Sequence, residues 1–214
     1  MTKVWDLALR IWHWCLVIAI IAAFVTAELA EESFDAAIWH MYVGVTVLAL
    51  LTFRLVWGVL GTRYAKWSSL KLAPRHLKSE AKHPTLGHSA TGSWATLLIL
   101  SAILTQAFTG LFSFDTGLYI GGPFSQSVSE SLQTLATSIH HLGEKVIVGV
   151  IALHLAALTF YQLTGKPILL SMIHGKKRSV TRNDPPHDSI SPTKLMVTIA
   201  LSVTLFVWLM LKLS

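Results

Sequence analysis

Five long apolar runs occupy most of the 214-residue sequence and limit what it can fold into. A helix of about 20 apolar residues crosses the ~30 Å hydrocarbon core of a bilayer. Because lipid offers no partner to backbone N–H and C=O groups, runs of this length must cross it as helices. The sequence therefore predicts an all-α integral membrane protein, a four-helix bundle with a fifth, C-terminal transmembrane helix. The predicted spans are residues 9–27, 36–60, 92–114, 139–163 and 195–211.

The composition agrees with a membrane location and excludes several other classes of protein. Charged residues make up 13% of the chain and hydrophobic residues 53%, whereas a soluble domain carries about a quarter charged residues. Cys15 is the only cysteine, which excludes a disulfide scaffold, a thiolate metal cluster and a c-type haem attachment motif. The formal net charge of +6 arises almost wholly in loops between apolar runs, so we predict contacts with membrane lipids and no nucleic-acid partner.

The charged loops predict the orientation of the chain in the membrane. By the spans given above, 15 of the 17 lysines and arginines fall on one side. The loops of the other side carry acidic residues, namely Glu28, Glu31, Glu32, Asp35, Asp115 and Glu130. By the positive-inside rule, the N-terminus is cytoplasmic and the C-terminus lies outside.

The chain divides into three parts. Residues 1–175 hold the first four spans, residues 176–194 form a basic cytoplasmic linker, and residues 195–214 form the last transmembrane helix. The longest outer loop is expected at residues 115–138, broken by Gly121, Gly122 and Pro123. Such a loop is either a docking surface for an outer partner or a plain connector.

Five of the ten histidines fall in predicted spans, where ionisable side chains are costly and mark functional sites. His13 lies near the inner end of the first span, and His40 lies near the outer end of the second. His140 lies near the outer end of the fourth span, and His154 follows it by 14 residues, which is ~21 Å along the helix and within ~40° of the same direction. His141 points ~140° away from His154, so we favour His140. His40 and His140 thus form an outer layer, and His13 and His154 an inner one.

The five remaining histidines are predicted to be solvated. They lie in inner, basic loops, where polar side chains are ordinarily exposed: His76, His83, His88, His174 and His187. We therefore look for function among the histidines of the spans.

Two histidines on facing helices at one depth can provide bis-imidazole ligation to a haem iron, as in b-type cytochromes. Zinc would need three or four ligands, whereas each layer has two. We predict one haem between His13 and His154 and a second between His40 and His140. The alternative is a metal or ion transporter that uses intramembrane histidines, although the inner layer lacks an acidic companion.

Two further residues share the face of His40. Gly44, one turn later, either leaves room for a porphyrin or serves helix packing. Arg54, 14 residues after His40, reaches the inner layer, where it either pairs with a propionate of the inner haem or extends to the cytoplasmic boundary.

At this point the sequence resembles the bacterial cytochrome b561-type family, which includes the b-type subunits of membrane-bound nickel-iron hydrogenases. The resemblance covers about residues 3–175 and rests on the order and spacing of several short motifs. These are Arg10-Ile-Trp-His13-Trp14, Trp39-His40 with Gly44, Arg54, Trp57-Gly58-Val-Leu-Gly61, Gly87-His88, Thr109-Gly110-Leu111-Phe112, and His140 to His154 followed by Tyr161.

The resemblance implies a four-helix core that binds two haems b through His13, His40, His140 and His154 in a bacterial inner membrane. Such proteins exchange electrons between the quinone pool and a periplasmic redox protein, a hydrogenase or a cytochrome c. We expect the quinone near the inner boundary, around His88 and Arg10.

One branch of the family resembles superoxide oxidase, which passes electrons from superoxide to ubiquinone, and we keep this activity as the alternative. That branch carries histidines within its third helix. This chain has Ser93, Thr96, Ser101 and Thr105 as the polar residues there, so the partner-coupled function ranks first.

Overall fold

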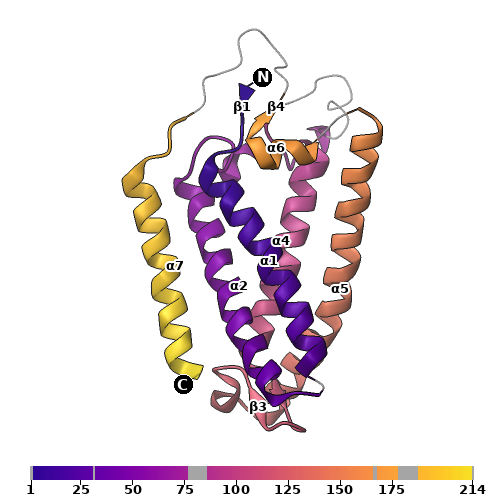
Figure 1. Ribbon diagram of the computed structural model, residues 1–214, viewed down its shortest axis with the longest axis vertical. Helices are drawn as coiled ribbons and strands as arrows, with labels where there is room; N and C mark the ends of the chain where they lie inside the picture. The colour runs from indigo at the N-terminus through magenta and orange to yellow at the C-terminus, as the bar shows by residue number, and fades with distance from the viewer. Residues whose placement is uncertain (1, 31, 77–85, 166–167, 178–187, 214) are drawn as a thin grey trace.

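The computed structural model describes residues 2–30, 32–76, 86–165, 168–177 and 188–213. Five long helices run side by side (Figure 1). They are α1 (Leu7–Ala30), α2 (Phe34–Leu60), α4 (Ala90–Gly110), α5 (Glu130–Leu163) and α7 (Pro192–Leu213). All five are long and apolar enough to cross a membrane. The predicted all-α bundle with a fifth span is confirmed, and the chain is a multi-pass membrane protein.

The helix ends alternate between two sides of the bundle. The N-terminus and the short helix α6 (Ile168–His174) lie at one end, and the C-terminus and strand β3 (Ile120–Gly121) lie at the other (Figure 1). We name the first end inner and the second outer, following the predicted orientation. Serines cap two of the helices at their N-termini: Ser33 accepts from Ala36 N in α2, and Ser89 accepts from Gly92 N in α4.

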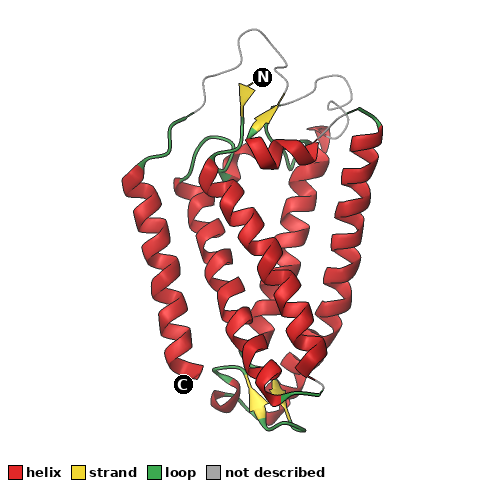
Figure 2. Cartoon of the chain, viewed as in Figure 1, coloured by secondary structure: helices red, strands yellow, loops and turns green. Residues whose placement is uncertain are grey.

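Helix α5 is longer than predicted, because it begins at Glu130 and not at residue 139. Residues 130–138 are mostly polar, so a search for apolar runs misses them although they are helical. The expected outer loop of residues 115–138 was therefore too long. The rest of this connection is ordered: β2 (Phe114–Asp115) pairs with β3, and the 3-10 helix η2 (Ser125–Ser127) follows (Figure 2).

The inner end is closed by a contact between distant parts of the chain. Strand β1 (Thr2–Lys3) pairs with β4 (Lys176–Lys177), and the indole of Trp5 donates to Ser171 Oγ on α6 at 3.2 Å. Gly175 between α6 and β4 has φ +76°, and a Cβ there would lie 2.7 Å from the Trp5 carbonyl oxygen. The start of the predicted linker 176–194 is thus a strand, while residues 178–187 lie outside the described residues.

Three pairs of helices pack most closely: α1 with α2, α4 with α5, and α2 with α7. Helices α2 and α4 also touch, and Leu209 of α7 belongs to one apolar cluster with Val45 and Leu48 of α2. Among the described residues, α5 makes no comparable contact with α1 or α2. The histidines of α5 therefore face α1 and α2 across a loosely packed interior.

Asp6 ties the start of α1 to the end of α2. Its carboxylate is 1% exposed and accepts from Leu9 N at 2.7 Å, from Trp57 Nε1 at 3.1 Å and from Thr62 Oγ1 at 2.6 Å. The first of these bonds caps α1, and the other two hold the last turn of α2 and the chain that follows it.

We expect Asp6→Ala to lower the free energy of unfolding by about 2–4 kcal/mol, because it leaves three buried donors without an acceptor. The melting temperature of the purified protein in detergent, followed by tryptophan fluorescence, measures this. Glu32→Ala, at an exposed position, is the matched control and should change it little. Equal melting temperatures for the two variants would contradict the structural role of Asp6.

Candidate functional site

His40 and His140 face each other near the outer end of the bundle. Their ring centroids lie 6.1 Å apart and their planes are nearly perpendicular, at 85°. The Nδ1 atom of His40 lies 3.0 Å from the carbonyl oxygen of Ala23, and that of His140 lies 2.9 Å from the carbonyl oxygen of Gln106. Because a carbonyl oxygen can only accept, each ring carries its proton on Nδ1, which leaves the Nε2 lone pair available to a metal.

The two rings are held by the same local pattern on different helices. A threonine follows each accepting residue by three positions, and its hydroxyl oxygen lies 3.3 Å from the same Nδ1 atom. These threonines are Thr26 on α1 and Thr109 on α4. Helix α1 thus orients the ring from α2, and α4 orients the ring from α5.

Two glycines shape the space around the outer pair. A Cβ at Gly110 would lie 3.0 Å from Cε1 of His140, so Gly110 allows that ring to approach α4 closely. A Cβ at Gly44 would meet nothing within 4 Å, so α2 presents an open backbone surface one turn below His40. His141 is exposed, on a different face of α5 from His140.

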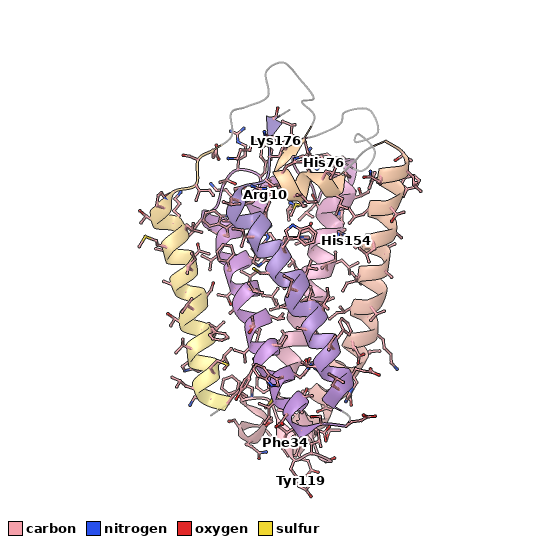
Figure 3. All side chains as sticks on the ribbon, viewed as in Figure 1. Arg10, Phe34, His76, Tyr119, His154 and Lys176 are labelled. Carbon is pink, nitrogen blue, oxygen red and sulfur yellow. The ribbon has the colours of Figure 1, made fainter. Side chains whose placement is uncertain are left out.

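His13 and His154 form a second pair further in. The two side chains are close enough to interact electrostatically, and Figure 3 shows His154 near the same end of the bundle as Arg10 and Lys176. Nδ1 of His13 is buried and has no hydrogen-bond partner in the described part of the chain. The inner pair therefore lacks the carbonyl anchors of the outer pair. A buried polar atom such as Nδ1 of His13 is ordinarily hydrogen-bonded.

The histidines meet in twos and not in larger groups. Within residues 2–30, 32–76, 86–165, 168–177 and 188–213, no three His, Cys, Asp or Glu side chains converge in a way that could hold a metal ion. A zinc centre needs three or four such ligands. The outer pair instead suits an iron whose other ligands come from a macrocycle, because two metal–imidazole bonds of ~2 Å plus the ring radii separate the centroids by about 6 Å.

Arg54 is 2% exposed, in the inner half of α2. Its Nη1 donates to the carbonyl oxygen of Ala65 at 3.0 Å, and its Cζ lies 4.0 Å from the Trp67 ring centroid and 5.7 Å from that of Trp12. Asp6 lies within electrostatic reach, but its carboxylate already accepts three bonds from other groups.

His88 is not solvated, contrary to expectation. It lies at the start of α4 against Trp5, with ring centroids 4.7 Å apart. Burial, together with the nearby positive charges of Arg54 and Lys177, lowers the pKa of His88 to about 3. His88 is therefore neutral at physiological pH. We predicted an exposed His88 because it lies in a basic loop. The ring is buried instead, because the N-terminal segment with Trp5 packs onto this loop.

Sequence reasoning also missed the groups that orient the outer rings. Two of these groups are the backbone carbonyls of Ala23 and Gln106, and the third is Gly110, which acts by having no side chain. The identity of a residue does not indicate what its backbone contacts. Only the two threonines, each close in depth to a histidine of the next helix, offered a clue.

A membrane helix bundle with facing imidazoles is the architecture of a b-type membrane cytochrome. The family model described as prokaryotic cytochrome b561 matches residues 4–175. This match covers most of the chain, which therefore belongs to the prokaryotic cytochrome b561 family and is a b-type haem membrane protein of electron transfer. No curated protein and no solved structure matches the chain. Helix α7 lies outside the matched residues.

Replacing His88 by glutamine should make the protein more resistant to acid. The pKa is about 3 in the folded protein and ~6.5 in an unfolded chain. As the pH falls below ~6.5, the unfolded chain binds a proton that the folded chain does not, so stability is lost down to pH ~3. Between pH 7 and pH 5, the melting temperature of His88→Gln should fall by about 4–8 °C less than that of the wild type.

The control for this experiment is His174→Gln, which removes an exposed histidine from the same end of the bundle. Its melting temperature should follow that of the wild type over the whole pH range. If His88→Gln also follows the wild type, burial of the neutral His88 ring does not contribute to acid sensitivity.

Proposed function

We propose that the chain holds two haems b and carries electrons between the quinone pool and a redox protein on the periplasmic face of a bacterial inner membrane. The outer haem is held by His40 and His140, and the inner haem by His13 and His154. One observation supports this most strongly: the two outer rings face each other with both Nδ1 atoms bound to backbone carbonyls and both Nε2 atoms available.

The residues around the outer pair fit the group. Gly44 leaves the α2 backbone open beside His40, where a flat macrocycle can lie against the helix. Gly110 lets His140 sit close to α4, and the Nδ1 bonds make both rings more basic ligands. When bound, each haem would supply a one-electron redox centre, held by His40 and His140 at the outer layer and by His13 and His154 at the inner layer.

The inner pair fits in a different way. The buried Nδ1 of His13 lacks a hydrogen-bond partner in the described residues. We therefore infer that the bound haem, more than the protein, orients this ring. Arg54 is a buried cation close to Trp12, the neighbour of His13, so its charge serves either an inner-haem propionate or another ligand at this depth. The layers are ~21 Å apart along α5, so together they span much of the bilayer.

The partner on the outer side is a hydrogenase or a cytochrome c. The outer connection offers it a surface ordered by the β2–β3 ladder, with Tyr119 84% exposed at the tip. Acidic residues Glu32, Asp35, Asp115 and Glu130 are exposed at this end, which favours a partner with a basic docking face.

Histidine variants test the number and the pairing of the haems. We expect two haems per wild-type chain by pyridine haemochrome assay. His40→Ala and His140→Ala should each remove the same spectral component and leave one haem, while His13→Ala and His154→Ala remove the other. His141→Ala should keep both. Fewer than two haems in the wild type, or one component lost in both His13→Ala and His40→Ala, would overturn the proposal.

Electron delivery tests the function itself. Decylubiquinol should reduce the haems of the wild type in nanodiscs, and an added oxidised cytochrome c or hydrogenase should reoxidise them from the outer side only. His40→Ala, which keeps the inner haem, should still be reduced but pass electrons outward at least ~100-fold more slowly. Rapid reduction of the haems by superoxide, with no protein partner, would support the alternative activity of a superoxide oxidase.

A further inference from the structure

A crevice of about 180 Å³ lies between α2 and α4, and its lining extends from the inner half of the bundle past the middle. Its walls are leucines from both helices, with Arg54, Trp67 and Ser101 as the residues that carry polar atoms. We propose that this crevice binds the head ring of a membrane quinone. The inference rests on the proposed function and adds to it the place where the quinone binds.

The size of the crevice suits one substituted six-membered ring. An apolar cavity of ~150 Å³ holds a benzene molecule, so about 180 Å³ accommodates a ring with small substituents. A porphyrin is several times larger, which separates the crevice from the haem sites. The lining is leucine for the most part, as expected for a ring that must leave lipid without hydration.

The crevice opens toward the acyl chains. Leu55 is 47% exposed and Leu104 is 39% exposed, and both belong to its lining. Leu97 and Leu104 follow the start of α4 at Ala90 by 7 and 14 residues, so they lie ~10 and ~21 Å into the span. A phospholipid phosphate stays at the headgroup level and does not reach this depth. A neutral quinone ring on a hydrocarbon tail can reach this depth and enter the crevice from the surrounding lipid.

Arg54 provides the polar contact. Its guanidinium is held from behind by the Ala65 carbonyl and by the Trp67 ring, which itself donates from Nε1 to the carbonyl oxygen of Leu55 at 3.1 Å. Trp67 fits because residue 58 is glycine: a Cβ there would lie 2.1 Å from the indole. A guanidinium has five N–H donors, and one donation to Ala65 leaves others for a ring carbonyl oxygen in the crevice.

This fixed cation also favours the chemistry of a quinone. A quinone becomes a quinol by taking up two electrons and two protons, and negative charge develops on its oxygens as the electrons arrive. A preorganised cation in a water-poor site stabilises that charge. The electrons are exchanged with the inner haem of the proposed function, whose ligand His13 adjoins Trp12, 5.7 Å from Cζ of Arg54.

Paired tryptophan substitutions on α4 test the site. Leu104→Trp fills the mouth of the crevice, and Leu98→Trp is the matched control, because Leu98 is a 50% exposed leucine of the same helix outside the lining. The haem-loaded proteins in nanodiscs are labelled with an azido-ubiquinone and mapped by mass spectrometry. We expect labels on α2 and α4 at the crevice, at least fivefold fewer in Leu104→Trp and the same number in Leu98→Trp.

Reduction by decylubiquinol gives a second readout. Leu104→Trp should raise the KM for decylubiquinol at least tenfold while both haems remain bound, and Leu98→Trp should leave the KM unchanged. Equal labelling and equal KM in the two variants would overturn the crevice site and leave the proposed function intact. Loss of haem from the wild type would instead overturn the proposed function, because the labelling does not depend on haem reduction.

Arg54→Gln separates the two roles considered for this side chain. We expect it to keep two haems and to lose most of the label, since glutamine can donate to a carbonyl but carries no charge and is shorter. Loss of the inner haem with labelling unchanged would assign Arg54 to the propionate and overturn its part in the crevice.

Discussion

The bond between an imidazole Nδ1–H and a carbonyl of the neighbouring helix is the interaction on which the outer site depends. It occurs twice, from His40 to Ala23 and from His140 to Gln106. Each bond lies inside a well-packed helix pair, the first between α1 and α2 and the second between α4 and α5. The rings then meet where the pairs approach each other, so each pair delivers one oriented ring, with its Nε2 free, to a shared site. In a bilayer such a polar contact also holds the pair together, because burying apolar surface against another helix gains little there.

The two layers differ in how much the protein fixes in advance. At the outer layer, carbonyls, threonine hydroxyls and Gly110 settle the tautomer and the orientation of the rings. At the inner layer, the hydrogen bonds of Asp6 and the pairing of β1 with β4 hold the backbone near His13 in place. The His13 ring itself has no hydrogen bond on Nδ1 within the described residues. The hydrogen bonds on Nδ1 therefore set the outer rings, whereas no such bond sets the ring of His13.

Much of the fold could be predicted from the sequence because lipid imposes a simple rule. Apolar runs gave the five spans, and the 14-residue spacing placed His140 and His154 on one face. The rule has nothing to say about polar helices, so residues 130–138 were assigned to a loop although they form the start of α5. Nor could it predict that the N-terminal segment packs over the loop before α4 and buries His88 against Trp5. Contacts made by backbone atoms, such as those of Ala23 and Gln106, leave no trace in residue type.

Helix α7 does not line the α2–α4 crevice. The family match ends at residue 175, so this helix is an addition to the four-helix core. It packs on α2 through Leu209, and Trp208 meets Phe124 of the outer connection with ring centroids 5.5 Å apart. Leu209 shares an apolar cluster with Val45 and Leu48 in the outer half of α2, and Leu195 packs against the inner cluster that contains Leu51 and Trp57, but none of the residues that line the crevice comes from α7. The added helix therefore covers a part of α2 that does not line the crevice, and leaves the crevice mouth at Leu55 and Leu104 uncovered. An extra helix packed over those two leucines would instead close the route that we propose for a quinone.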